Sequence, residues 1–340
     1  MNGNRQSAKT RLATMADVAA TAGVSQITVS RALRNPDSVA PETRKKIAAA
    51  IKQVDYVPNG VAGSLRSRQT NLVAAIIPSI THHFLGRMIQ GFSDVLSPSG
   101  LHLMLGTSGE SLLGEERIVA AFLAQRPRGI LLHNTEHTDA CRQLLAQSGI
   151  PVIETGDLAP KPIDTAVGYS NFDAAFAMTR HLIERGYRCI AFVGRMRQNE
   201  RVAERLRGYL EALKEAGIAE KSGPIIEAPA GLGGGAQVIS QLLEEHPLVD
   251  AVFFGGDALA GGALLECNRR GVPVPGRIAI AGYDDDDLAA ELKPSLTALR
   301  IPRYETGRRV AETLLLMLRD VPVPSNTIDL GFELLHREST

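Results

Sequence analysis

Hydrophobic positions near the start of the chain recur at the three-to-four-residue spacing of amphipathic helices, and polar signals mark where each helix begins or ends. Thr14 can cap a first helix, which Gly23 ends in the left-handed conformation that helix ends favour. Ser25 can cap a second, shorter helix, and Pro41 suits the first position of a third. The pattern therefore predicts three short helices within residues 14–54.

The second predicted helix, residues 26–33, has one apolar and one polar face. Val29 and Leu33 would face inward, which leaves outward Gln26, Ile27, Ser30 and Arg31. Two helices joined by a Gly-containing turn, the second with polar residues at its start, form the arrangement that enters the major groove of DNA. A plain three-helix bundle with a polar surface would give the same pattern, so the remainder of the chain has to decide between these interpretations.

From Leu72 onwards, short apolar runs alternate with amphipathic helices. A first series contains the strands LVAAIIP, LHLMLGTS, GILLH and PVIET, and a second contains TAVGYS, CIAFVG, DAVFFGG and IAIAGYD. Such alternation is typical of parallel sheets that are covered by helices on both faces. The chain is therefore predicted to be an α/β protein whose body has two lobes, with a ligand cleft at the carboxyl ends of the strands.

Charge separates these two regions of the chain. Residues 1–70 hold eleven Lys or Arg and four Asp or Glu, whereas the remaining residues hold 26 and 33, so a net charge of +7 is followed by one of −7. A basic segment on an acidic body suggests a polyanionic partner for that segment. Together with the helix-turn-helix pattern, the charge favours DNA binding, with an affinity that falls steeply as salt is added.

Other function classes lack their sequence signatures. No run approaches 18 consecutive apolar residues, and the first residues lack the apolar core of a signal peptide, so we expect a cytoplasmic protein without membrane contact. Cys141, Cys189 and Cys267 lack metal-ligand spacing, and neither a metal nor a cofactor is expected. The Gly-rich runs GLGGGAQ and GGDALAGG match neither GxxxxGK[ST] nor GxGxxG, and no nucleophile–base pair is evident, so no enzyme activity is predicted.

Three segments carry a specific resemblance: DVAATAGVSQITVSRALRNP, VAPETRKKIAAAI and DYVPNGVAGSLRS. They resemble the DNA-binding head of the lac repressor (LacI/GalR) family of bacterial transcription regulators, and the likeness continues to near residue 335. Within that family, PSITHHFLGRMIQGFSDVL, TAVGYSNFDAA and IDLGFEL are similar to the gluconate-repressor group. The resemblance implies a homodimeric repressor that binds double-stranded operator DNA and is released by a small-molecule effector, gluconate or 2-ketogluconate.

The same resemblance implies the division of the chain. It gives a flexible basic tail (1–13), a helix-turn-helix domain (14–58), a hinge helix with linker (59–70) and a body resembling periplasmic sugar-binding proteins (71–340). The first lobe would comprise residues 71–168 and 302–321, and the second lobe residues 169–300 and 322–340. Three crossovers between the lobes are expected near 168–172, 299–302 and 321–324.

The family's DNA contacts fall on the second helix and the hinge. Gln26, Ile27 and Arg31 correspond to residues that read base edges; Gln suits adenine, Arg suits guanine, and Ile can meet a thymine methyl group. Phosphate contacts are expected from Ser25, Thr28, Ser30 and Asn59. In the hinge, Val61 is a further expected contact, and Leu65 matches the leucine that wedges into the minor groove.

The family's effector contacts fall at strand ends of the body. Arg205, in RLRGY, corresponds to an arginine that grips ligand oxygens, and Asp284, in AGYDDDD, to an aspartate that binds hydroxyls. Gly256 stands where the family often has Asn, and Asp257 after it is interpreted as a helix cap. Further cleft candidates follow other strands: Ser79, His82, Phe84, Thr107, His133 and Thr155.

Three alternatives remain open at this point. The effector could be a neutral sugar or another metabolite, since few residues decide ligand choice. The body pattern also fits a cytoplasmic α/β enzyme that uses a nucleotide, or an extracytoplasmic sugar-binding protein. The basic head, which neither of these last two classes explains, favours the DNA-binding regulator.

Overall fold

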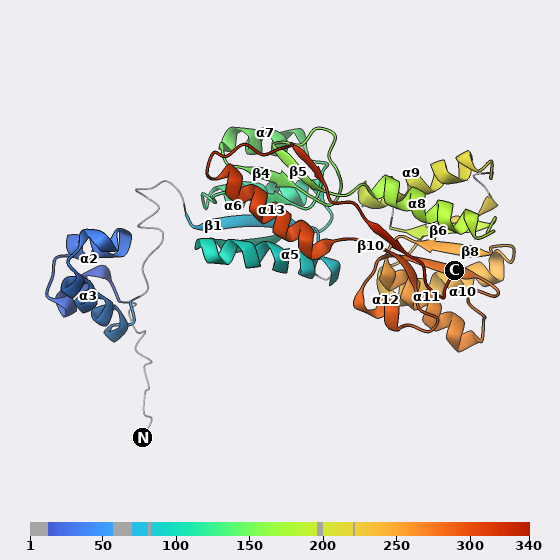
Figure 1. The fold of residues 1–340 in the computed structure, drawn as a ribbon, viewed down its shortest axis with the longest axis horizontal. Coiled ribbons are helices and arrows are strands. Elements are labelled where there is room, and N and C mark those ends of the chain that lie inside the picture. Colours follow the sequence, from blue (N-terminus) through green and yellow to red (C-terminus); the bar gives the residue numbers. More distant parts are fainter. Residues whose placement is uncertain (1–12, 57–69, 81–82, 196–199, 220–221) are drawn as a thin grey trace, which may run out of the picture. The chain divides into compact units, whose positions relative to one another are not determined.

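The structure, a computed structural model, describes residues 13–56, 70–80, 83–195, 200–219 and 222–340. The chain forms two compact units, residues 1–70 and residues 71–340 (Figure 1). Within the described ranges, no helix has the length and apolar character needed to cross a membrane.

The first unit contains the predicted helices, and the polar signals act where they were expected. The elements are α1 (Met15–Ala22), α2 (Gln26–Arg34), the 3-10 turn η1 (Pro36–Ser38) and α3 (Pro41–Gln53). Thr14 forms a capping box with Asp17, and Gly23 ends α1 at φ 68°. The Ser25 side chain accepts a hydrogen bond from the backbone N–H of Thr28 and thereby caps α2. A small core holds the unit together, formed by Val18, Ala19, Val29, Ala32, Ile47, Ala50 and Tyr56.

The body contains two six-stranded sheets, one in each lobe. The first is parallel throughout its described pairings, in the order β11 (Thr327–Asp329), β5 (Thr165–Gly168), β4 (Val152–Glu154), β3 (Ile130–Leu132), β1 (Leu72–Ile77) and β2 (His102–Thr107). The second has the order β12 (Glu333–Leu335), β10 (Thr297–Arg300), β9 (Ala279–Asp284), β8 (Ala251–Phe254), β6 (Ile190–Gly194) and β7 (Ile225–Glu227). Only β12 runs antiparallel to its described neighbour. These sheets confirm the α/β class and the two lobes.

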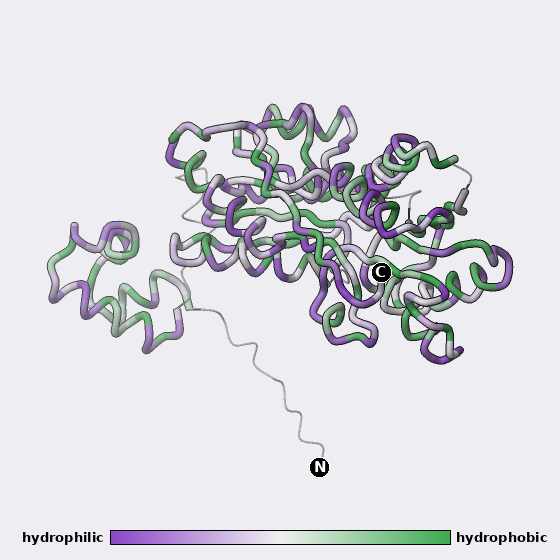
Figure 2. Tube along the Cα trace, turned by 45° about the vertical axis from the view of Figure 1, so that its right-hand side comes forward, coloured by the Kyte–Doolittle hydropathy of each residue, from purple (hydrophilic) through white to green (hydrophobic). Residues whose placement is uncertain are grey.

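Helices cover both faces of each sheet, and four apolar clusters lie between the layers. In the first lobe, α5 (His83–Leu96) and α13 (Arg303–Met317) pack on one face, and α6 (Leu112–Leu123) and α7 (Asp139–Ser148) on the other. In the second lobe, α8 (Asn171–Glu184) and α9 (Glu200–Glu215) lie opposite α10 (Gly231–Glu245) and α11 (Asp257–Arg270). Short helices follow α5 and β9: η2 (Ser97–Ser99) and α12 (Asp287–Glu291). Figure 2 shows the hydrophobic stretches of chain gathered in the interior of each lobe.

The structure corrects the assignment of one predicted strand to the second series, although the predicted first lobe (71–168) already contained that strand, and it corrects one boundary of the lobes. The strand at TAVGYS does not open the second series, because β5 pairs with β4 in the first sheet. The third crossover does not lie near 321–324, because β11 pairs in parallel with β5 and so still belongs to the first lobe. The third crossover lies instead between β11 and β12, near residues 330–332. Both terminal strands are three residues long and only partly buried, so they carry no hydrophobic repeat that the sequence could reveal.

Candidate functional site

The exposed face of α2 presents the side chains that the sequence assigned to base reading. Gln26, Ile27 and Arg31 are exposed, and Ile27 keeps 70% of its surface accessible although it is apolar. Val29, on the opposite side of the helix, is fully buried. Ser25 is exposed at the cap, and Thr28 and Ser30 are half-buried beside it. The predicted hinge residues Asn59, Val61 and Leu65 and the tail through residue 12 lie outside the described residues.

A cavity of about 750 Å³ lies between the two lobes of the body, at the carboxyl ends of their strands. Its walls include five of the predicted effector residues, namely Ser79, Thr107, Arg205, Gly256 and Asp284. Three arginines and four carboxylates line it, namely Arg195, Arg201, Arg205, Glu110, Asp257, Asp284 and Asp286. A cavity with several forked donors and several acceptors suits a small ligand that carries many oxygen atoms.

Arg205 is held in the wall by α9 and by neutral partners. Its Nε donates to Asn171 Oδ1 at 2.8 Å, and its Nη1 donates to the carbonyl oxygen of Gly255 at 2.6 Å. The guanidinium carbon lies 3.5 Å from the centroid of the Tyr283 ring, within cation–π range. Three residues further on, a Cβ at Gly208 would lie 2.1 Å from the carbonyl oxygen of Phe172. The RLRGY segment therefore needs its glycine so that α9 can approach α8 and place Arg205.

Asp284 ends β9 and joins the lobes through an ion pair. Its carboxylate accepts a hydrogen bond from Arg303 of α13, and the same guanidinium donates to the Tyr169 hydroxyl at 3.2 Å. Both members of the pair are buried. The backbone of Asp284 has φ 111°, so the chain turns sharply as it leaves the strand. Asp284 thus reaches the cavity as an acceptor that is already held by a cation from the first lobe.

Asp257 also lines the cavity, and its role differs from the predicted helix cap. The N-cap position of α11 is Gly256, and the Asp257 side chain makes no capping bond. Instead, its Oδ2 accepts from the backbone N–H of Asp286 at 2.7 Å, which ties α11 to the turn after β9. Burial, followed by the charge of Asp284, raises the pKa of Asp257 well above its usual value. With no side chain at Gly256, this carboxyl group becomes part of the cavity wall.

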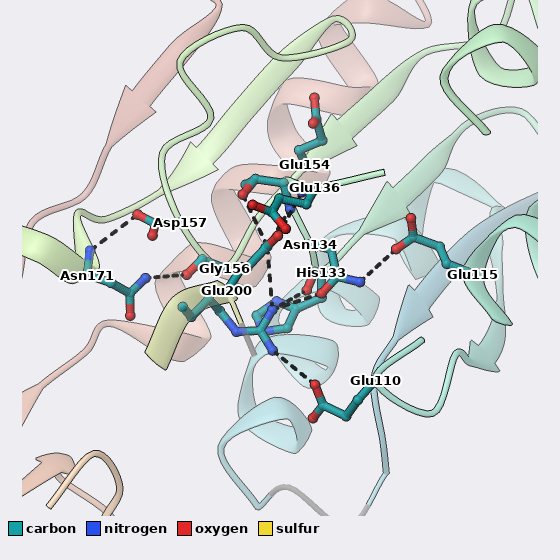
Figure 3. A network of polar contacts seen from close by, with 12 residues as sticks. Glu110, Glu115, His133, Asn134, Glu136, Glu154, Gly156, Asp157, Asn171 and Glu200 are labelled. Carbon is teal, nitrogen blue, oxygen red and sulfur yellow. Dashed lines mark hydrogen bonds and ion pairs between the residues drawn. The ribbon is translucent and has the colours of Figure 1, made fainter. Parts of the chain in front are cut away.

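The start of α9 carries two residues that reach across the cleft, and the sequence analysis did not single them out. Glu200 accepts from the backbone N–H groups of Thr135 and Glu136, at 2.7 and 2.8 Å. Arg201 Nη1 donates to the carbonyl oxygen of His133 at 2.8 Å and to Asn134 Oδ1 at 2.9 Å. Figure 3 shows Glu200 beside His133, Asn134 and Glu136, which belong to the loop of residues 133–138 after β3. This loop is the part of the first lobe that α9 binds.

Comparison with known proteins identifies the family. Residues 14–59 match the pattern of the bacterial regulatory proteins of the lacI family, and residues 179–340 match the periplasmic binding protein-like domain. The HTH-type transcriptional regulator GntR of Pseudomonas aeruginosa is 39% identical over 328 residues, which cover 96% of this chain and 95% of that protein. The chain belongs to the LacI family. The HTH-type transcriptional regulator GntR of Escherichia coli K12 is 35% identical to this chain, over 94% of this chain and 96% of that protein.

Solved structures of LacI-family regulators share the whole architecture. A LacI-family transcriptional regulator from Silicibacter pomeroyi matches with a TM-score of 0.91 and 33% identity, over 96% of this chain and 99% of that chain. The likeness thus extends over the DNA-binding unit and both lobes. These findings make the chain a LacI-family transcriptional regulator, and they place it among regulators rather than enzymes.

Not every predicted effector residue of this LacI-family chain reaches the cavity. His133 and Thr155 follow β3 and β4 as expected, but both side chains are buried behind the cavity wall. His133 still takes part through its carbonyl oxygen, which Arg201 binds. His82 and the side chain of Phe84 lie outside the described residues. The one sequence signal for Arg201 is its position four residues before Arg205, which puts both on one face of a helix.

The loop of residues 133–138 is anchored to the first lobe by buried charged side chains. His137 lies between two carboxylates, with Nδ1 2.5 Å from Glu115 Oε1 and Nε2 3.1 Å from Glu154 Oε1. Burial alone would lower the pKa of His137, but these hydrogen bonds raise it to about 9, so the ring is a cation at neutral pH. Asn134 Nδ2 donates to the other oxygen of Glu115 at 2.8 Å. The arrangement fixes the loop that Glu200 and Arg201 bind.

A metal ion could be considered at the same place, because Glu115, His137 and Cys141 have ligand atoms within 4.8 Å of one another. Burial, followed by the charge of Glu115, raises the pKa of Cys141 to about 12. A protonated thiol is a poor metal ligand. Both nitrogens of His137 already bond to carboxylates, so the cluster is complete as an ion-pair network.

Proposed function

We propose that this LacI-family regulator is a cytoplasmic, homodimeric repressor whose operator binding is controlled by a sugar acid, gluconate or 2-ketogluconate. The observation that carries the proposal is the cavity between the lobes, whose walls combine three arginines with several carboxylates. Arginines suit a carboxylate, and carboxylates suit the hydroxyl groups of a polyol chain. The likeness of the body to the gluconate-repressor group and the GntR relatives support the same ligand class.

On the DNA side, α2 would enter the major groove. Gln26 and Arg31 are exposed and can each make a forked contact, with adenine and guanine respectively. Ile27 offers an exposed apolar surface for a thymine methyl group. Two heads related by a two-fold axis would read a pseudo-palindromic site.

The effector would act through the angle between the lobes. Arg201, Glu200 and Arg303 all bond across the cleft, so a ligand that binds between the lobes changes how strongly these contacts hold them together. The ligand can shift operator affinity only by as much as its own affinity differs between the operator-binding and the released arrangement. We propose that the sugar acid favours the released arrangement and therefore acts as an inducer.

Operator binding tests the proposal directly. Fluorescence anisotropy would follow binding to DNA upstream of the protein's own gene and its neighbours, with gluconate, 2-ketogluconate or the neutral polyol glucitol added. We expect specific binding that weakens steeply with salt and is released by one of the acids. Arg31→Ala should weaken operator binding and relax the preference at the base that Arg31 reads, whereas Arg180→Ala, on the exposed surface of the body, should leave both unchanged.

Two outcomes would contradict the proposal in different ways. Specific DNA binding that responds only to a neutral sugar would reject the sugar acid and keep the regulator. Binding with the same affinity to every DNA sequence would reject operator recognition by α2.

A further inference from the structure

Two buried arginines lie one helical turn apart on α9 and face the same cavity, but their surroundings differ. Arg205 lies near Asp284, a carboxylate of the cavity wall that can accept hydrogen bonds from ligand hydroxyls. Arg201 lies nearer the first lobe, where it bonds a carbonyl oxygen and the amide oxygen of Asn134. The two side chains would therefore meet different parts of one ligand.

Arg201 is a buried cation without a carboxylate in hydrogen-bonding contact. Its side chain is 4% exposed, and the nearest described carboxylate oxygens are those of Glu200 at 3.9 Å and Glu110 at 4.0 Å. The Glu200 carboxylate is already bound by Thr135 and Glu136. Burying a charged group costs free energy unless an opposite charge pairs with it. Burial accordingly lowers the pKa of Arg201.

Arg303 is a buried arginine of the same protein that does pair with a carboxylate. It is as buried as Arg201, but it donates directly to the carboxylate of Asp284. Arg201 uses only Nη1 for its hydrogen bonds to described residues. The edge formed by Nε and Nη2 makes no hydrogen bond to a described residue. That edge is the one that binds a carboxylate through two parallel hydrogen bonds.

We propose that Arg201 is the residue that selects an anionic effector, by binding its carboxylate while it remains bonded to the loop of residues 133–138. The inference rests on the proposed function, whose ligand class it refines by assigning the acid group to one residue. Arg205 and the carboxylates of the second lobe then bind the hydroxyl groups. Because Arg201 bonds the first lobe from the second, the bound acid group would also strengthen the contact between the lobes.

Glu110 gives the proposal a second, opposite consequence. It lines the cavity and lies on the Nη2 side of Arg201, where a ligand carboxylate would have to bind. The two anions would compete for the same guanidinium group. Removing the charge of Glu110 should therefore improve the binding of an acid and leave a neutral ligand unaffected.

The test compares gluconate with glucitol, which has a hydroxymethyl group in place of the carboxylate, by calorimetric titration of the full chain. For the unmodified protein we expect gluconate to bind at least about tenfold more tightly. Arg201→Gln should weaken gluconate binding by about 10- to 100-fold, the range for loss of a charged hydrogen-bond pair, and should weaken glucitol binding much less. Glu110→Gln should strengthen gluconate binding several-fold.

Two further variants separate the role of Arg201 from damage to the fold. Arg201→Lys keeps the charge but loses the planar fork, so we expect intermediate gluconate affinity. Arg207→Gln removes an exposed arginine of the same helix, which pairs with Glu204, and should bind both ligands as the unmodified protein does. Thermal unfolding of each variant would establish that it is folded.

Other results would contradict the assignment of Arg201 or the effector class. Equal affinity of the unmodified protein for gluconate and glucitol, or an Arg201→Gln variant that keeps its preference for gluconate, would reject Arg201 as the selecting residue. In the second case the proposed function would stand. Binding of a neutral sugar by the unmodified protein, with no binding of any sugar acid, would reject the effector class itself.

Discussion

The two lobes carry buried charges near the cleft, and these charges differ in the partners that they bond. In the first lobe, the charge of His137 is completed by Glu115 and Glu154, which bond both ring nitrogens. In the second lobe, Arg201 and Arg205 hydrogen-bond only carbonyl and amide oxygens among the described residues. Since an incompletely paired buried charge is costly, the difference separates a charge that stabilises the protein from the arginines that we propose bind the effector.

The largest effect is expected from removal of the His137 cation. His137→Leu would leave the carboxylates of Glu115 and Glu154 buried without their partner, which typically costs about 3–5 kcal/mol. Urea unfolding of the body would measure the loss. His102→Gln, at an exposed histidine of the same lobe, serves as the control and should change stability by less than about 0.5 kcal/mol. A small loss at His137 would mean that its charge is not structural.

The unmodified protein should show the same cation in its pH dependence. The folded pKa of His137 is raised from 6.5 to about 9, so its stabilising contribution is fully present below pH 6.5 and is lost as the pH rises through about 9. The difference in pKa corresponds to about 3 kcal/mol. Unfolding free energies measured between pH 6 and 10 should therefore fall, and the fall should be absent in His137→Leu.

Arg205→Gln should affect stability less than the His137 variant and ligand binding more. It removes hydrogen bonds to two neutral acceptors, Asn171 Oδ1 and Gly255 O, and leaves no carboxylate stranded, so we expect a loss of about 1–3 kcal/mol. Calorimetry should show weaker binding of both gluconate and glucitol, because Arg205 is assigned to hydroxyl groups. Selective loss of gluconate binding would instead place the acid group at Arg205.

The sequence predicted the helices of the DNA-binding unit better than the contacts across the cleft. The reason is the distance along the chain between the residues that interact. In the DNA-binding unit, Thr14, Gly23, Ser25 and Pro41 act within a few residues of their own positions, so local patterns were enough to place α1, α2 and α3. The family resemblance added Arg205 and Asp284, which the structure brings to one cavity.

The contacts across the cleft could not be predicted in the same way. Glu200 and Arg201 bond residues 65 and 68 positions earlier in the chain, in the other lobe. His133 and Thr155 follow strands as other cavity residues do, but only the tertiary fold decides that their side chains lie behind the wall. Nothing in the local sequence distinguishes a strand-end residue that faces a cavity from one that is buried.

The smallest effect on stability and binding is expected for a solvent-exposed ion pair on α9. Arg207 lies on α9 two residues after Arg205, but its side chain is 63% exposed and pairs with Glu204. Exposed pairs of this kind contribute at most about 0.5 kcal/mol, because solvent screens both charges. Glu204→Gln should therefore leave urea unfolding and gluconate binding unchanged. A loss comparable with that of Arg205→Gln would show that burial does not separate the two kinds of arginine on this helix.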